Sequence, residues 1–166
     1  MSTVQDLANY LDAYVNSAAM SLLEKAAFMA RMNHETGGFQ WMVELGGSSY
    51  FEQYDNRADL GNNQPGDGYL FRGRGFIMLT GRYNYTKYAP LSGADILNNP
   101  DLAANADVAA RIAILFWNNT FVGGQSISTW ARNGNIDNVV LGVNGGTNGM
   151  QQTIDLYNQY KKIYGV

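Results

Sequence analysis

The feature that most constrains this chain is a stretch of thirty residues, 46–75, that carries no helical repeat. It holds seven glycines together with scattered Asn and Asp. Irregular segments of this length are uncommon inside compact domains, and those that occur are usually functional. Amphipathic helical patterns lie on both sides of it. We therefore expect a mainly α-helical domain in which this segment forms one wall of a cleft.

Five stretches have apolar residues at helical spacing, and each is expected to form a helix. They are residues 4–15, 22–35, 106–117, 136–143 and 150–164. Ser2 or Thr3 can cap the first helix, and Ser21 with Glu24 forms a capping box for the second. Lys25 and Arg31 are expected on the solvated face of that second helix.

The remaining segments predict less regular structure. A short helical turn is expected between residues 92 and 100, since Pro100 ends what precedes it. Residues 69–72 and 76–79 are expected to pair as a small β-hairpin around Gly73 and Gly75.

Composition narrows the function classes. The chain has 166 residues, which suits one domain, and its net charge of −3 provides no basic face for nucleic acid or an anionic membrane. It has no cysteine and one histidine, so we expect no disulfide, no metal and no cofactor. No apolar run can span a bilayer and no leader is seen. We expect a monomer.

Glu35 is the first candidate catalytic residue, because it is expected to end the second helix. Gly37 and Gly38 follow it and can adopt the left-handed conformation of a helix stop. The partial negative charge of a helix C-terminus disfavours an ionised carboxylate there. An apolar wall would strengthen this preference for the protonated form by desolvation, and the residues expected to supply it are Phe39, Trp41 and Met42.

Glu44 is the second candidate. On an uninterrupted helix it would lie about 13.5 Å beyond Glu35, but the glycine pair allows the chain to fold back. Two carboxyl groups across a cleft, one protonated and one ionised, are what cleavage of a glycosidic bond requires. From spacing alone the signal is weak, since most pairs of glutamates at a given spacing are solvated surface charges. The 13% of aromatic residues suits sugar rings, although most aromatic side chains lie in protein cores.

Several motifs, in this order over residues 26–157, resemble glycoside hydrolase family 19, which comprises chitinases and related phage endolysins with a lysozyme-like fold. The pattern begins with His-Glu-Thr-Gly-Gly at 34–38 and Glu44. It continues through residues 54–62, 65–68, 72–77, 79–85, 99–102, 116–117 and 143–146. The resemblance implies a single catalytic domain over residues 1–166, mainly α-helical, with two lobes and a small β-hairpin.

The resemblance also implies roles for individual residues. Glu35 corresponds to the general acid and Glu44 to the general base that activates water for inversion. Thr80 corresponds to a residue that helps to hold this water. Asn84 corresponds to a contact of the N-acetyl group and Tyr83 to part of the sugar-binding wall. A further cleft residue is implied at Asn144.

Four arginines leave two interpretations open. They can keep Glu44 ionised, or they can form structural ion pairs with Asp55, Asp59 and Asp67. The arginines are Arg57, Arg72, Arg74 and Arg82.

Two positions depart from the family pattern. Met78 stands where glutamine is usual, and Thr153 stands where an arginine that supports the acids is common. The first departure removes an amide from the cleft and the second removes a cation.

The function expected from the sequence is hydrolysis of β-1,4 bonds in the glycan strand of peptidoglycan, as in an endolysin. The chain is short and cysteine-free, like phage lysis enzymes. Such an enzyme would be made in the host cytoplasm and act on the cell wall. Chitin oligomers are the alternative substrate, and a non-catalytic sugar-binding or virion structural domain is the second alternative.

Overall fold

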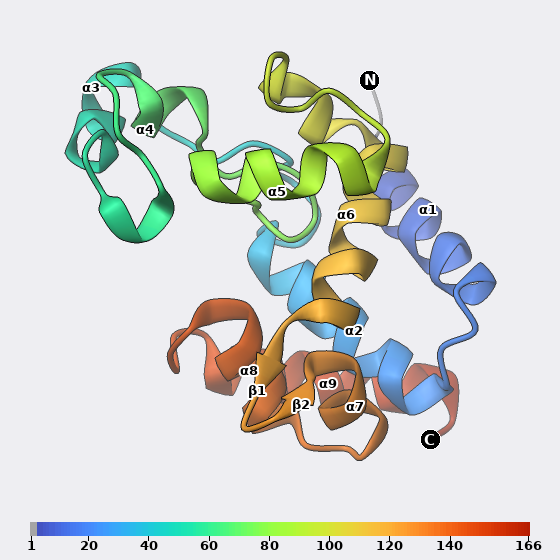
Figure 1. The fold of residues 1–166 in the computed structure, drawn as a ribbon. Helices are drawn as coiled ribbons and strands as arrows, with labels where there is room; N and C mark the ends of the chain where they lie inside the picture. The colour runs from blue at the N-terminus through green and yellow to red at the C-terminus, as the bar shows by residue number, and fades with distance from the viewer. Residues whose placement is uncertain (1–2) are drawn as a thin grey trace. The chain divides into compact units, whose positions relative to one another are not determined.

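The computed structural model describes residues 3–166 and divides the chain into two compact units. Unit 1 combines the residues up to 40 with residues 114–166, and unit 2 is the continuous segment 41–113. Figure 1 shows that both units consist mainly of helices. The mainly α-helical class expected from the sequence is confirmed.

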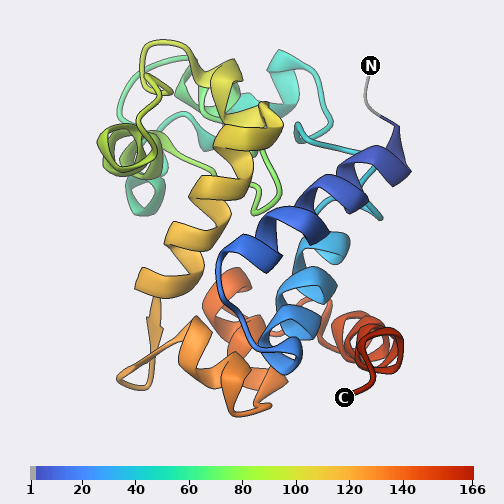
Figure 2. The ribbon, with the colours of Figure 1, turned by 90° about the vertical axis from the view of Figure 1, so that its right-hand side faces the viewer.

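Unit 1 holds most of the long helices. Its elements are α1 (Val4–Ser17), α2 (Leu22–Glu35), β1 (Phe121–Val122), β2 (Gln125–Ser126), α7 (Ile127–Arg132), α8 (Ile136–Asn144) and α9 (Met150–Tyr164). Helix α2 packs against α7, α8 and most extensively α9. Figure 2 shows α9 almost end-on beside α2. The central position of α2 explains why its residues from Glu24 to Met32 are buried all round the helix.

The starts of the first two helices follow the predicted capping. The hydroxyl of Thr3 accepts a hydrogen bond from the Asp6 N–H, and the Asp6 carboxylate accepts one from the Thr3 N–H. The other suggested cap, Ser2, lies outside the described residues. Ser21 caps α2 by accepting the N–H of Glu24 at 3.2 Å. Each cap satisfies backbone donors that the first helical turn leaves without partners.

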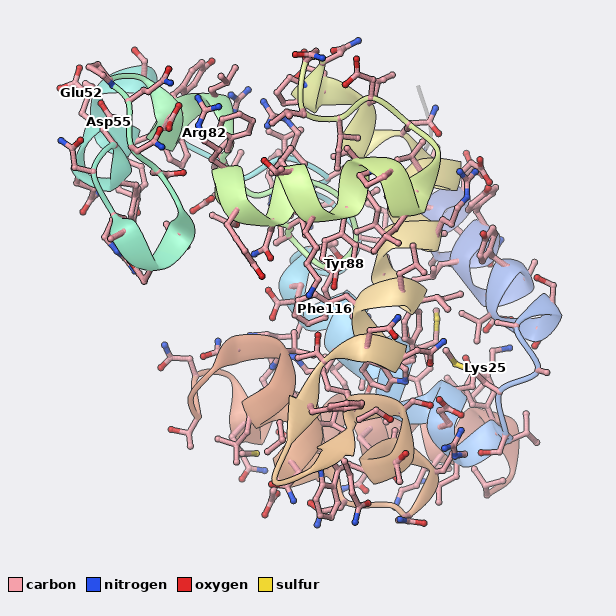
Figure 3. All side chains as sticks on the ribbon, in the orientation of Figure 1. Lys25, Glu52, Asp55, Arg82, Tyr88 and Phe116 are labelled. Atoms are coloured by element: carbon pink, nitrogen blue, oxygen red, sulfur yellow. The ribbon has the colours of Figure 1, made fainter. Side chains whose placement is uncertain are left out.

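Lys25 lies inside unit 1 and not on the solvated face that the sequence suggested. Its side chain, labelled in Figure 3, is buried. The ammonium donates to the Asp12 carboxylate and to the Asn16 amide oxygen, both at 2.8 Å, and lies over the Tyr164 ring. An amphipathic pattern misplaces a lysine of this kind because the counter-charge comes from another helix.

Unit 2 consists of short helical turns joined by loops. Its elements are α3 (Ser48–Phe51), the 3₁₀ helices η1 (Glu52–Tyr54), η2 (Ala58–Leu60) and η3 (Pro100–Ala104), α4 (Asp67–Leu70) and α5 (Arg82–Ser92). Helix α6 (Ala106–Asn119) begins in unit 2 and ends in unit 1. The irregular character predicted for residues 46–75 is confirmed, with four single helical turns inside it.

The hairpin expected near residues 69–79 is wrong in position. Residues 67–70 form α4, and Arg74 pairs with Leu79 only as an isolated antiparallel bridge. Within the described residues the named strands are β1 and β2, which pair antiparallel in unit 1. Short apolar runs do not distinguish a strand from a helical turn, and strands of two residues carry no periodic signal.

Residues 92–100 contain the expected helical turn. Ser92 is the last residue of α5, and the Asn99 N–H then donates to the Asp95 carbonyl at 3.0 Å, which closes one turn before η3 begins at Pro100. The sequence did not predict α5, which contains Pro90 and has little separation of apolar from polar faces. Hydrogen bonds from Arg82 to Asn62 and Asp67, described below, hold the start of this helix.

Candidate functional site

Glu35 is the last residue of α2, as predicted. Three consecutive left-handed residues reverse the chain after it, namely Gly37 (φ 59°), Gly38 (φ 78°) and Phe39 (φ 65°). The Thr36 hydroxyl donates to the Met32 carbonyl at 2.7 Å and accepts the Phe39 N–H at 2.9 Å. These bonds satisfy the helix end and hold the strained Phe39 backbone in place.

Arg31 is the charged partner of Glu35, one helical turn earlier on α2. Its guanidinium forms an ion pair with the Glu35 carboxylate and donates to the Thr153 hydroxyl of α9 at 2.9 Å. The Arg31 side chain is fully buried, whereas that of Glu35 is 19% exposed. Burial lowers the pKa of the Arg31 guanidinium, and the neighbouring Glu35 opposes this change.

This arrangement corrects two expectations. The solvated position suggested for Arg31 is wrong, because its side chain is enclosed between α2 and α9. Thr153 was expected to leave the acid without a supporting cation, but the guanidinium of Arg31 lies between Thr153 and Glu35. Thr153 is itself fully buried.

Glu44 lies in unit 2, immediately after the bridge between Val43 and Arg74. Its N–H donates to the Gly73 carbonyl at 2.8 Å, and the Gly73 N–H donates to Glu44 Oε2 at 3.0 Å. A Cβ at position 73 would lie 3.1 Å from Glu44 Oε2 and 3.3 Å from Thr80 Oγ1. The bare backbone of Gly73 therefore allows Glu44 and Thr80 to come close together.

A cavity of about 220 Å³ lies beside these two side chains within unit 2. Glu44 and Thr80 line it together with Phe51, Tyr54, Arg57, Leu60, Asn62, Gly68 and Arg72. The Thr80 hydroxyl donates to the Met78 carbonyl at 2.8 Å. The oxygen of Thr80 can also accept a hydrogen bond, so the cavity can order a water molecule next to a carboxylate.

Asn84 and Tyr83 lie on the first turn of α5. The Asn84 amide donates to the Thr80 carbonyl at 3.0 Å and so fixes the backbone that carries Thr80. The Tyr83 side chain is 61% exposed, which leaves its ring free to pack on a ligand. Its backbone abuts Gly61, where an added Cβ would come within 2.6 Å of Tyr83 Cβ.

Asn144 is the last residue of α8 and is exposed. Gly145 follows with φ 78° and ends the helix, as the Asn-Gly-Gly turn predicted. Glu35 and Asn144 thus belong to unit 1, whereas Glu44, Thr80, Tyr83 and Asn84 belong to unit 2.

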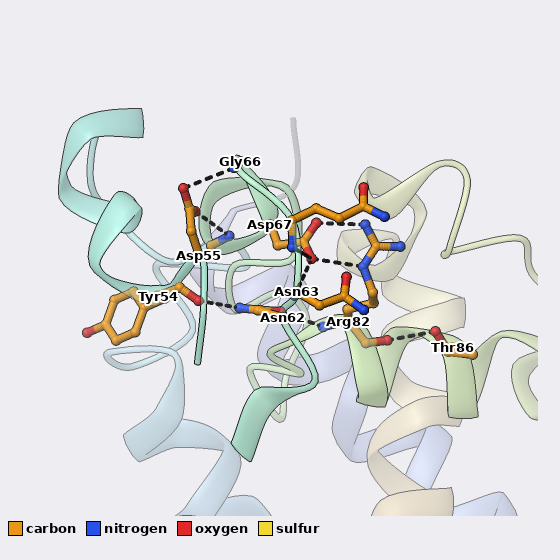
Figure 4. A network of polar contacts seen from close by, with 10 residues as sticks. Tyr54, Asp55, Asn62, Asn63, Gly66, Asp67, Arg82 and Thr86 are labelled. Carbon is orange, nitrogen blue, oxygen red and sulfur yellow. Dashed lines mark hydrogen bonds and ion pairs between the residues drawn. The ribbon is translucent and has the colours of Figure 1, made fainter. Parts of the chain in front are cut away.

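The loop wall of unit 2 is held by carboxylates that accept backbone N–H groups (Figure 4). Asp55 accepts from Gly66 and Gly68, each at 3.0 Å. The Asn62 amide donates to the Tyr54 carbonyl at 2.8 Å, and its oxygen accepts the Arg82 N–H at 2.9 Å. These bonds link the irregular segment to the start of α5 and so position the cavity lining.

Asp67 and Arg82 form the buried ion pair of this wall (Figure 4). The Arg82 guanidinium donates to both carboxylate oxygens, at 2.8 and 2.7 Å, and the Asn63 and Gln64 N–H groups also donate to Asp67. The bonds from Arg82, followed by those from the backbone, hold the pKa of Asp67 below its usual range. Arg82 therefore has the structural role that the sequence left open.

Replacing Asp67 by asparagine is expected to lower the free energy of unfolding by about 2–4 kcal/mol near pH 7, because it breaks a buried, bidentate pair. The lowered pKa means that this stabilisation is complete above about pH 4 and disappears as pH falls through the folded-state value. Thermal unfolding of both proteins from pH 7 to pH 2 should therefore show their stabilities converging in acid.

Asp59→Asn is the matched control, since Asp59 pairs with Arg57 on the surface. Exposed pairs contribute little, so this variant should unfold almost like wild type at every pH. A constant difference between wild type and Asp67→Asn down to pH 2 would contradict the assignment of the pH dependence to Asp67.

Of the other three arginines, one forms structural contacts and two line the cavity. Arg74 pairs with Asp101 and donates to the Tyr85 hydroxyl at 3.0 Å, and the buried Tyr85 has its pKa raised to about 12 by desolvation. Arg57 and Arg72 line the cavity with Glu44. Arg72 lies over the Tyr69 ring at 4.0 Å.

Tyr54 and Asn62 line the cavity but were not predicted as site residues, although both lie in the matched segment 54–62. The signal that could have identified them is an aromatic residue and an amide within one motif of the family pattern.

No group of three or more His, Asp or Glu side chains within residues 3–166 is arranged to hold a metal ion. Asp55, Asp59 and Asp67 are each bound to arginine or backbone donors. In this same range, no helix combines the length and apolarity needed to cross a bilayer.

Sequence comparison gives matches over most of the chain. A family model described as chitinase class I, of glycosyl hydrolase family 19, matches residues 9–128. A Haemophilus influenzae protein described as glycosyl hydrolase family 19 domain-containing is 28% identical over 169 residues, which cover 85% of this chain and 80% of that protein. The acidic 27 kDa endochitinase of Solanum lycopersicum is 39% identical over 98 residues, 57% of this chain and 36% of its own length.

Comparison with solved structures gives the same family. A bacterial family 19 chitinase is 28% identical, with a TM-score of 0.76 over 96% of this chain and 85% of that chain. A class IV chitinase from Zea mays is 25% identical, with a TM-score of 0.68 over 100% of this chain and 83% of that chain. The lysozyme-like helical fold expected from the sequence is confirmed by these matches. The chain spans 32–44% of the length of the plant endochitinases that it matches in sequence.

Proposed function

Because the chain belongs to glycoside hydrolase family 19, we propose that it cleaves the β-1,4 bonds of an N-acetylated glycan with Glu35 as general acid and Glu44 as general base. The observation that carries this proposal is the cavity in unit 2 where Glu44 and Thr80 lie together. A carboxylate beside a hydroxyl can bind and deprotonate one water molecule. When the base activates water for direct attack on the anomeric carbon, the configuration of that carbon is inverted.

Each implied residue has a chemical task in this mechanism. Glu35 gives its proton to the leaving glycosidic oxygen, and Glu44 takes a proton from water as the water attacks the anomeric carbon. The Gly73 N–H donates to Glu44 Oε2 and so holds this carboxylate in place. Thr80 orients the water, Asn84 secures Thr80 and contacts the N-acetyl group, and Tyr83 offers an exposed aromatic face to a sugar ring.

Chitin is the substrate that we propose first. The sequence alone favoured peptidoglycan, but the plant relatives are named endochitinases and the matched structures are chitinases. Both polymers are β-1,4 chains that carry N-acetyl groups, so the same cavity chemistry serves either. Peptidoglycan cleavage, with the endolysin role that the sequence suggested, is the second candidate, favoured by the absence of cysteine.

The test compares the purified protein on chitin hexamers and on purified peptidoglycan. We expect a kcat/KM for chitin hexamers at least about tenfold higher than that for muropeptide strands, because recognition of a sugar hydroxyl or amide discriminates by this much or more. NMR of the first products should show the α-anomer at the new reducing end. The opposite substrate order would favour the endolysin role.

Retained β-configuration would contradict a water-activating role for Glu44. Saturable binding of chitin hexamers without turnover would instead support the non-catalytic sugar-binding alternative.

A further inference from the structure

We propose that Arg31 is a positioning residue for Glu35: its buried guanidinium, held by Thr153, orients the carboxylate. This inference rests on the proposed role of Glu35 as general acid. It adds a residue that the family resemblance did not assign and explains how the chain functions with threonine at position 153.

The first argument is the isolation of the guanidinium. Arg31 has no exposed surface, and its Nε–H is buried without a hydrogen-bond partner among the described residues. Its side-chain bonds are those to Glu35 and Thr153. A buried charge without its counter-charge is strongly unfavourable, so the state of Arg31 depends on Glu35 more than that of a surface arginine would.

The second argument is the rigidity of the surroundings. Arg31 and Glu35 are four residues apart on one helix, a spacing that brings side chains together on the same face. The last turn of α2 is fastened to α9 on either side of this pair. His34 is hydrogen-bonded to Gln152, and the Asn33 amide donates to the Tyr160 hydroxyl at 3.3 Å. The guanidinium consequently presents its donors to Glu35 from a fixed position. In the part of the chain that the structure describes, Arg31 is the charged residue that forms an ion pair with Glu35.

The test measures kcat and KM for chitin hexamers in three variants. Arg31→Met should lower kcat by about 10- to 100-fold with KM nearly unchanged, because an acid that is no longer held in position affects the transition state and not ground-state binding. Arg31→Lys keeps the charge but loses the planar fork, so kcat should fall only about tenfold. Thr153→Val, which removes the bond that holds the guanidinium, should lower kcat roughly 3- to 10-fold.

Arg111→Met is the matched control. Arg111 pairs with Asp107 at the same four-residue spacing on α6, and its ion pair is exposed. This variant should leave both kcat and KM unchanged. Circular dichroism establishes that each variant is folded, and Arg31→Gln, which can still donate to Thr153, replaces Arg31→Met if the latter does not fold.

A wild-type kcat in the neutral variant would overturn the proposal, as would a loss that appears in KM and not in kcat. If both neutral variants fail to fold, Arg31→Lys and Thr153→Val decide the matter, since a wild-type kcat in both would overturn the proposal. Failure of the proposed function is a separate result: Glu35→Gln would then hydrolyse chitin hexamers like wild type, whatever the Arg31 variants do.

Discussion

Replacing Glu35 by glutamine is expected to lower kcat for chitin hexamers by about 10²–10⁴-fold, the usual contribution of a general acid. Glutamine has the size of glutamate, and its amide oxygen can still accept a hydrogen bond from Arg31. What it lacks is a proton that can be given to the leaving oxygen. KM should change little, because the change acts on the transition state.

The measurement is steady-state hydrolysis at the pH optimum, together with thermal unfolding. Unfolding is needed because Arg31 keeps its buried charge while its partner becomes neutral. Glu52→Gln is the control, since Glu52 is an exposed glutamate on η1 outside the cavity lining. Wild-type turnover in a folded Glu35→Gln protein would remove Glu35 from the mechanism.

Replacing Glu44 by glutamine is expected to lower kcat by a similar factor of about 10²–10⁴. The amide cannot take a proton from water, although its oxygen can still accept the Gly73 N–H. Azide should partly restore turnover of an activated substrate, since this anion attacks the anomeric carbon without losing a proton. The product should be the α-glycosyl azide, because attack occurs on the face opposite the leaving group.

The same Glu52→Gln control applies, and azide should not accelerate it. Azide rescue of Glu35→Gln in place of Glu44→Gln would exchange the two assigned roles. Formation of a β-glycosyl azide in Glu44→Gln would indicate that azide takes the place of the leaving group, as it does in retaining enzymes.

The sequence predicted the local features of this molecule well. The stop at Glu35 was predicted from a helical pattern and two following glycines, and the structure has it at the predicted residue. The caps at Thr3 and Ser21 are likewise decided by residues within one helical turn. These interactions join neighbours in sequence, so a pattern of letters is enough to find them.

Features that depend on distant residues were missed. Arg31 was assigned to the solvent because its partner Thr153 lies 122 residues away. The hairpin was expected around Gly73 because the apolar runs on either side of it resemble short strands. The strands that do form, β1 and β2, are too short to carry an alternating pattern. Helix α5 was missed because its stability comes from bonds such as that between Arg82 and Asp67 and not from an apolar stripe.

Unit 1 combines two separate parts of the chain, and this determines when its contacts can form during synthesis. Helix α2 is synthesised early, but its main packing partner, α9, is completed only when the ribosome reaches residue 164. Closing a loop of this length costs entropy before any contact repays it. Unit 2 is continuous in sequence and can fold while synthesis proceeds. Until α9 has been made, Arg31 therefore lacks its partner Thr153 and is not yet buried beside Glu35. The surroundings of Glu35 are completed only in the last steps of folding.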